Sequence, residues 1–372
     1  MKLGGSALLC QDTERCSNRL TMILLSRGQL PFHHPLIWLP MHHTFSRTTR
    51  SRLQILLAVL TSFLHADIRA DEDLFGDWSL QLKSATPAWM SVRRTDGQPQ
   101  VRFRLYVGSD GPHTNVSVQQ NTLSFTLNQN KNLQGSRSVE ATLVDGQLHG
   151  SLIITAGDGS ITRDEFRGIR IPPLPDSPPD LSAVRFGPPR SLFNGRDLTG
   201  WRPHETDKVN GWSVQDGVLT NTTPKTDFSA TGAYANLRTI ETFADFRLHI
   251  EFLIESDRNS GIYLRGMYEA QVVDRDSRMQ GIQGPGAIFG QIKPTENAGL
   301  PGGQWQTYDL TLVDRHITVV LNGKKVIDNQ PLTGPTAGAV FTNPAAPGPI
   351  YLQGDHTSVR YRNISLAPVL RD

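Results

Sequence analysis

Apolar and polar side chains alternate with a period of two along much of this chain, and this pattern constrains its fold more than any other feature. Examples are residues 101–107 (VRFRLYV), 122–127 (TLSFTL) and 246–253 (FRLHIEFL). Successive side chains of a β-strand point to opposite faces, so the alternation predicts strands with one face on a core. Turn signals such as Asp145-Gly146 and Asn322-Gly323 separate these runs and predict hairpins. The pattern therefore predicts an all-β protein.

A proline-rich segment divides the alternating pattern into two regions. Residues 172–190 contain seven prolines, a density that favours extended backbone and interrupts a strand ladder, so we interpret this segment as a semi-rigid linker. Residues 71–171 are predicted to form a small all-β domain, either a barrel or a sandwich. Residues 191–372 are predicted to form a larger domain, and their strands with long loops suit a two-sheet jelly roll.

The segment 1–70 ends in the pattern of an export signal. Three arginines within residues 47–52 precede the apolar residues 53–64, and a small residue follows at Ala66 and again at Ala70. Basic residues, then an apolar run, then a small residue is the order of a secretory signal peptide. We therefore predict cleavage after Ala70, with Ala66 as the alternative, translation from Met41, and a secreted or periplasmic mature protein.

Charge and cysteine usage exclude several classes of function. The chain holds 37 Lys and Arg and 35 Asp and Glu; residues 1–70 contain eight of the basic and three of the acidic ones, which leaves 29 and 32 in residues 71–372. This balance predicts no basic surface and no nucleic-acid partner. Both cysteines, Cys10 and Cys16, lie in the first stretch, so the mature chain has no thiol for a disulfide or a nucleophile. No apolar run reaches the ~20 residues of a membrane helix, and no membrane span is expected in the mature protein.

One strand face of the second region is unusually polar. Alternation places Arg247, His249 and Glu251 opposite the apolar residues of 246–253, and it places Tyr263, Arg265, Glu269 and Gln271 on one face of residues 261–273. If residues 261–265 and 269–273 form a hairpin with the three-residue loop 266–268, Arg265 faces Glu269 and Tyr263 faces Gln271. An aromatic ring beside bidentate donors and acceptors suits a sugar, so the hairpin predicts a carbohydrate site.

The second region also resembles the 3-keto-disaccharide hydrolase domain family. The resemblance extends in order over residues 191–201 (SLFNGRDLTGW), 211–219 (GWSVQDGVL), 259–265 (NSGIYLR), 268–274 (YEAQVVD), 286–289 (GAIF), 303–306 (GQWQ), 321–323 (LNG) and 361–364 (YRNI). It implies a concanavalin-like jelly roll and a sugar-related hydrolase. The linker and the preceding β domain are similar to the arrangement in secreted planctomycete-type members.

The implied substrate is an oligosaccharide or an oxidised disaccharide, and its chemistry suggests roles for the polar residues. A ketone at C3 acidifies the proton at C2, so one general base can form an enolate that expels the oxygen at C1, after which water adds. We predict Glu269 or Glu251 as the base, Arg265 as the enolate stabiliser and His356 as the acid. The predicted substrate-binding residues are Tyr263, Gln271, Asn259, Trp305, Gln353 and Arg362.

Other functions are compatible with the same residues. Glu251 and Glu269 could serve as the two carboxylates of a conventional glycosidase, although the E-x-D-x-x-E run of laminarinase-like jelly rolls is absent. A non-catalytic carbohydrate-binding module would need only the aromatic and amide groups, and a structural cell-envelope protein would need neither. No cofactor is expected, and no catalytic metal, because no close histidine pair such as H-x-x-x-H is present in residues 71–372. A structural calcium ion at Asp274 and Asp276 is an alternative.

Overall fold

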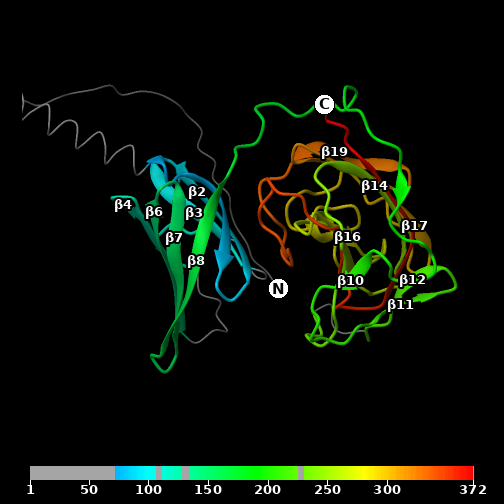
Figure 1. Cartoon of the computed structure of the whole chain (residues 1–372), viewed down its shortest axis with the longest axis horizontal. Helices are drawn as coiled ribbons and strands as arrows, with labels where there is room; N and C mark the ends of the chain where they lie inside the picture. The colour runs from blue at the N-terminus through cyan, green and yellow to red at the C-terminus, as the bar shows by residue number, and fades with distance from the viewer. Residues whose placement is uncertain (1–71, 106–110, 128–134, 225–229, 372) are drawn as a thin grey trace, which may run out of the picture. The chain divides into compact units, whose positions relative to one another are not determined.

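The computed structural model describes residues 72–105, 111–127, 135–224 and 230–371 (Figure 1). The predicted export signal, its cleavage site and the predicted start at Met41 lie outside the described residues. Within the described part, the chain is almost entirely β, and no helix is long and apolar enough to cross a membrane. The prediction of an all-β protein is confirmed.

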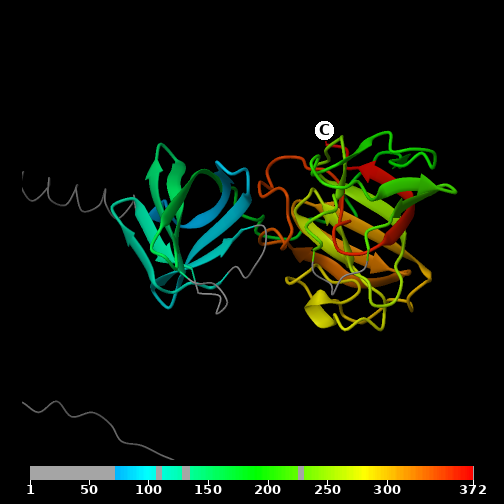
Figure 2. The ribbon, with the colours of Figure 1, turned by 90° about the horizontal axis from the view of Figure 1, so that it is seen from below.

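The first domain is a single antiparallel sheet that curls into a near-closed barrel (Figure 2). Its strand order is β3-β2-β1-β8-β7-β6-β5-β4, and mutual backbone hydrogen bonds of 2.7 and 3.0 Å between Val101 and His113 join β3 to the segment before β4. The structure therefore favours the barrel over the sandwich. The strands are β1 (Gly76–Leu82), β2 (Pro87–Thr95), β3 (Gln98–Arg104), β4 (Val116–Gln119), β5 (Thr122–Thr126), β6 (Gly135–Val144), β7 (Gln147–Ala156) and β8 (Ile161–Ile171).

The second domain is a sandwich of two antiparallel sheets. One sheet has the order β10-β13-β20-β15-β16, and the other has the order β11-β12-β21-β14-β17-β18-β19, with β9 paired to β21. The strands are β9 (Arg190–Ser191), β10 (Trp201–Pro203), β11 (Trp212–Gln215), β12 (Val218–Asn221), β13 (Leu237–Thr239), β14 (Phe246–Leu253), β15 (Ser260–Leu264), β16 (Tyr268–Val272), β17 (Trp305–Val313), β18 (His316–Leu321), β19 (Lys324–Pro331), β20 (Tyr351–Leu352) and β21 (Val359–Pro368); the short 3₁₀ helix η1 spans Gly281–Gln283.

Each domain has its own hydrophobic core. Phe246, Leu248, Ile250 and Phe252 of β14 are buried in the core of the sandwich, together with apolar residues of β15 and β16. Leu80, Met90 and other residues of the barrel strands form a separate core. The alternation in the sequence therefore identified the core-facing side chains of β14, because every second side chain of a half-buried strand points into the core.

The turn signals form the hairpins that they predict. Asp145-Gly146 joins β6 to β7, and Asn322-Gly323 joins β18 to β19, with positive φ at both residues of each pair. Asparagine, aspartate and glycine tolerate this left-handed backbone better than other residues do.

The second half of the proline-rich segment lies against the sandwich. Backbone hydrogen bonds join Gly187 to Pro368 and Leu370 to Arg185, and the guanidinium group of Arg247 stacks at 4.3 Å on the ring of Phe186. The linker boundary at 190 thus falls inside a segment that packs on the second domain. Separate folding of the two domains stays a prediction.

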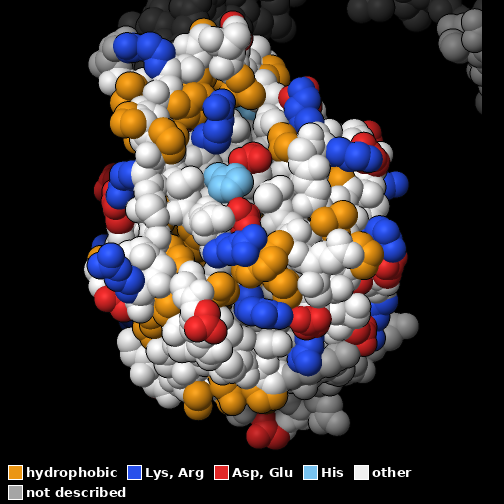
Figure 3. Space-filling model, turned by 90° about the vertical axis from the view of Figure 1, so that its right-hand side faces the viewer, with side chains coloured by type: hydrophobic (Ala, Val, Ile, Leu, Met, Phe, Trp, Pro, Cys, Tyr) orange, Lys and Arg blue, Asp and Glu red, His pale blue; other side chains and the backbone are white. Residues whose placement is uncertain are grey.

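The charge distribution agrees with the nearly balanced composition. On the face seen in Figure 3, basic and acidic side chains lie beside one another, and no large area of one sign is visible there.

Candidate functional site

A row of side chains from five strands crosses the outer face of the five-stranded sheet. The backbone register places Glu269 of β16 opposite Tyr263 of β15, and Tyr263 opposite Tyr351 of β20. It continues from Tyr351 to Arg238 of β13, and from Arg238 to Arg202 of β10. Directly opposed residues share a face of a sheet, and the neighbouring residues on these strands belong to the core. The row therefore points away from the core.

A second row runs beside the first. Gly261 lies opposite Gln271, and the backbone N–H of Gln353 donates to the carbonyl oxygen of Gly261 at 2.9 Å. On the next strand, the side-chain oxygen of Asn236 accepts the N–H of Gly354, and the N–H of His204 donates to the backbone oxygen of Asn236. Polar groups thus cover this sheet face from edge to edge.

Gly261 leaves the space that the carboxyl group of Glu269 occupies. A methyl group at position 261 would lie 2.3 Å from Oε1 and 2.8 Å from Cγ of Glu269, which no real contact allows. The glutamate side chain is only 3% exposed. A glycine in the middle of a strand weakens the strand but permits this close approach.

The pKa of Glu269 is raised to about 8. Burial is the main cause, the negative charge of Asp355 acts in the same direction, and a hydrogen bond with Tyr263 acts against both. A buried carboxyl group without a cationic partner favours its neutral form. At pH 7, Glu269 therefore holds a proton in most molecules.

Tyr263 makes further hydrogen bonds beside Glu269. Its phenolic O–H donates to the carbonyl oxygen of Ala337 at 2.9 Å, and the Nε2 group of Gln353 donates to the phenolic oxygen at 3.4 Å. A phenol has one hydrogen, and a carbonyl can only accept. The hydrogen bond between Tyr263 and Glu269 lowers the pKa of the carboxyl group and so favours its ionised form, but burial outweighs it.

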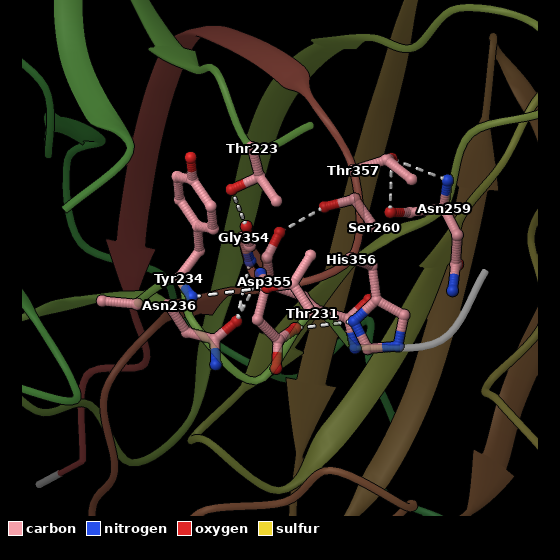
Figure 4. Close-up of polar contacts among 12 residues, drawn as sticks. Thr223, Thr231, Tyr234, Asn236, Asn259, Ser260, Gly354, Asp355, His356 and Thr357 are labelled. Carbon is pink, nitrogen blue, oxygen red and sulfur yellow. Dashed lines mark hydrogen bonds and ion pairs between the residues drawn. The ribbon is translucent and has the colours of Figure 1, made fainter. Parts of the chain in front are cut away.

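The loop 353–357 presents a histidine–aspartate pair (Figure 4). Nδ1 of His356 lies 2.6 Å from Oδ1 of Asp355, whose side chain is 5% exposed against 19% for the histidine. A carboxylate on Nδ1 keeps the proton there and leaves Nε2 as a basic nitrogen. The pair can therefore accept a proton from a bound molecule.

Neighbouring strands hold the loop in place. The side-chain oxygen of Asn236 accepts the N–H groups of both Gly354 and Asp355, at 2.7 and 3.2 Å. On the other side, the hydroxyl of Thr357 accepts the N–H of Asn259 and donates to its carbonyl, both at 2.9 Å (Figure 4). The predicted binding residue Asn259 thus anchors the loop through its backbone.

The structure contradicts the predicted pairing of Arg265 with Glu269. The hairpin loop has three residues, as parity requires, but it spans residues 265–267, because Leu264 pairs with Tyr268. Arg265 has a positive φ of 56° and leaves the strand. Its guanidinium group donates to the carbonyl oxygen of Ala346 at 2.6 Å, so Arg265 holds a neighbouring loop.

Glu251, Trp305 and Arg362 lie on the other sheet, away from Glu269. Nε of Arg362 donates to Glu251 at 2.7 Å, and the guanidinium group stacks at 4.0 Å on the ring of Trp305. Burial acts to raise the pKa of Glu251, but hydrogen bonds from Asn363 and Arg362 outweigh it and lower the pKa. Glu251 and Glu269 therefore lie on different sheets and do not form the predicted pair of carboxylates, because alternation does not show to which sheet a strand belongs.

The structure does bring Tyr263, Gln271 and Gln353 together on the face that carries Glu269. Gln271 donates through Nε2 to the carbonyl oxygen of Gln283 in η1, at 3.1 Å. The side-chain oxygen of Gln353 is buried without a hydrogen-bond partner among the described residues. Tyr263 and Gln271 are each 1% exposed and Gln353 is 8% exposed, so sugar contacts of these three residues stay a prediction.

The acidic residues considered for calcium are engaged elsewhere. Asp274 accepts the backbone N–H groups of Asp257 and Asp276, both at 3.1 Å, and Asp276 pairs with Arg275. The part of the chain that the structure describes contains no group of three or more His, Cys, Asp or Glu side chains arranged to hold a metal ion.

Sequence reasoning missed Asp355, Tyr351, Asn236, Arg238 and Arg202. Tyr351 could have been found, because residues 350–353 (IYLQ) alternate between apolar and polar. β10 and β13 have only three residues each, too few for alternation to identify a face. Asn236 acts through contacts with a segment far away in the chain, whereas Asp355 pairs with its neighbour His356.

Comparison with known proteins gives one family and several solved structures. Residues 188–367 match the model of the 3-keto-alpha-glucoside-1,2-lyase-like domain. A candidate glycosyl hydrolase from Parabacteroides distasonis is 21% identical, with 49% of this chain and 94% of that chain covered and a TM-score of 0.41. For porphyranase B from Zobellia galactanivorans the identity is 11%, the coverage 54% and 100%, and the TM-score 0.32. A comparison with curated proteins finds no match.

Proposed function

Because residues 188–367 belong to the 3-keto-alpha-glucoside-1,2-lyase-like domain family, we propose that this carbohydrate-active protein cleaves the glycosidic bond of 3-keto-glucosides, including 3-keto-disaccharides. The observation that carries the proposal is the buried Glu269, whose pKa is raised to about 8 by burial and by the charge of Asp355, the carboxylate that pairs with His356. One group can give a proton and the other can take one, which is what an elimination requires.

The reaction divides into two proton transfers. A base removes the proton at C2, and the electrons of the C–H bond form an enolate with the ketone at C3. The enolate then forms the C1–C2 double bond as the C1–O bond breaks, and the departing oxygen takes a proton from the acid. Addition of water across the double bond completes the hydrolysis.

We assign the base to His356 and the acid to Glu269. His356 has a carboxylate on Nδ1, so Nε2 can accept the C2 proton and Asp355 stabilises the resulting imidazolium. Glu269 keeps its proton near neutral pH, which suits protonation of a departing alkoxide. This assignment reverses the roles predicted from the sequence.

Leaving-group dependence tests the assignment. With a 3-keto-glucoside of an aliphatic alcohol, Glu269→Gln should lower kcat by ~10²–10⁴, because the alkoxide needs a proton. With the 4-nitrophenyl 3-keto-glucoside the loss should be far smaller, because nitrophenolate leaves without one. His356→Asn should slow both substrates. Glu251→Gln is the matched control, a carboxylate on the other sheet, and should leave both rates within about twofold.

Three results would contradict the proposal. Equal losses on both substrates in Glu269→Gln would remove the acid role. Binding of the sugar without turnover of any 3-keto-glucoside would indicate a carbohydrate-binding module. Cleavage of the unoxidised parent disaccharide would indicate a conventional glycosidase, and Asp355, whose charge acts on Glu269, would then be the second carboxylate.

We also propose that the protein acts outside the cytoplasm. The support is the basic, apolar and small-residue order of residues 47–70.

A further inference from the structure

Two arginines face each other at the end of the first row that lies farthest from Glu269. Arg202 of β10 and Arg238 of β13 are directly opposed in the register, on the same face as Tyr351. Such residues have Cβ atoms ~4.5–5.5 Å apart, and like charges in this position destabilise a sheet. The sandwich therefore keeps an unfavourable pair on the face that carries the candidate site.

Nothing in the described part of the chain neutralises this pair. Nε of Arg238 is buried without a hydrogen-bond partner among the described residues, and no described carboxylate forms an ion pair with either arginine. Glu205 follows β10, but its two carboxylate oxygens accept the backbone and side-chain N–H groups of Asn236, at 2.9 and 3.0 Å. Phe341 lies 5.7 Å beneath the guanidinium group of Arg238 and orients it.

The distance along the row places the pair away from the reacting bond. Three strand intervals separate Glu269 from Arg238, which is roughly 14 Å between their backbones at ~4.8 Å per interval. The arginines are therefore placed to contact the sugar that leaves rather than the sugar that carries the ketone.

We propose that Arg202 and Arg238 bind an anionic substituent on the leaving sugar, either the carboxylate of a uronic acid or a sulfate ester. The inference rests on the function proposed above and narrows its substrate class. The planar guanidinium fork matches two oxygens of either anion, and a bound anion removes the repulsion between the arginines.

The test compares three 3-keto-glucosides that differ only in the leaving sugar: glucose, glucuronate and glucose 6-sulfate. The wild-type protein should prefer one or both charged probes by at least ~10-fold in kcat/KM, and the better probe identifies the anion. Arg238→Gln should lose ~10–100-fold on that probe and less than ~3-fold on the neutral one. Arg360→Gln, which removes an exposed arginine paired with Glu255 on the other sheet, is the matched control and should change neither. Equal losses on charged and neutral probes, or no preference in the wild type, would overturn the proposal.

A binding measurement separates this proposal from the proposed function. Calorimetry with the unoxidised glucosyl-glucuronate and glucosyl-glucose 6-sulfate requires no turnover. Binding that weakens in Arg238→Gln and in high salt supports the anion site even if no 3-keto-glucoside is cleaved. Absence of binding for both charged sugars overturns it. Arg238→Lys is the control for misfolding, because lysine keeps the positive charge but lacks the bidentate guanidinium group. This variant should lose less affinity than Arg238→Gln does.

Discussion

Replacing Glu269 by glutamine should stabilise the sandwich domain, and the gain should grow with pH. In the folded protein the carboxyl group keeps its proton up to about pH 8, whereas an ordinary glutamate releases it near pH 4.5. Between these values the unfolded chain binds one proton fewer than the folded chain does, so the free energy of unfolding falls as pH rises. Glutamine has no proton to lose, and its amide can still donate to the oxygen of Tyr263.

The magnitude follows from the two pKa values. The contribution of Glu269 to the free energy of unfolding is fully present below pH 4.5 and is lost as the pH rises to about 8. The loss is about 1.4 kcal/mol per pH unit. At pH 7 the free energy of unfolding of the wild type should therefore be lower than that of Glu269→Gln by roughly 3 kcal/mol, relative to the difference between the two proteins at pH 4. Urea unfolding of both proteins from pH 4 to pH 8.5 measures this difference, and groups common to both cancel.

A constant difference across this range would refute the reasoning. It would mean that Glu269 ionises near its ordinary pKa. The assignment of Glu269 as a general acid at neutral pH would fall with it.

Three further changes test other parts of the structure. Gly261→Ala places a methyl group 2.3 Å from Oε1 of Glu269, so turnover should fall by at least ~10²-fold and unfolding assays should show a loss of about 1–3 kcal/mol. Arg265→Ala removes the bond to Ala346 and should cost about 1–3 kcal/mol on thermal unfolding, with kcat of the folded protein nearly unchanged; a large loss of kcat would return Arg265 to the site. A fragment of residues 174–372 should unfold cooperatively and melt higher than 191–372, which lacks the contacts of Phe186 and Gly187; equal melting of both would show that those contacts contribute nothing.

The sequence predicts side-chain direction well and strand neighbours poorly. Along residues 246–253 and 261–273 the alternation identified the core-facing residues, because local geometry alone sorts side chains onto two faces. It could not place Glu251 and Glu269 on different sheets, since β14 pairs with β17 and β21 while β16 pairs with β15. Pairing depends on contacts between distant segments, which no local pattern records.

The hairpin register shows where local reasoning reaches its limit. Parity requires an odd loop, but it does not say at which residue the strand ends. The end is set by Arg265 and Gly266, which both adopt positive φ. Of the two, only Gly266 is a residue type that predicts a positive φ. The sequence therefore places the loop one residue too far along the chain and pairs Arg265 with Glu269.

The strand order has a consequence for when the site can form during synthesis. β20 lies between β13 and β15, and β21 lies between β12 and β14, so both sheets are completed by residues from the last part of the chain. The row from Glu269 to Arg202 cannot assemble until Tyr351 has left the ribosome, and closing such distant pairings is slow. A nascent chain that has exposed Glu269 and the arginines thus still lacks Tyr351 and His356, and the candidate site is complete only after nearly the whole chain has been made.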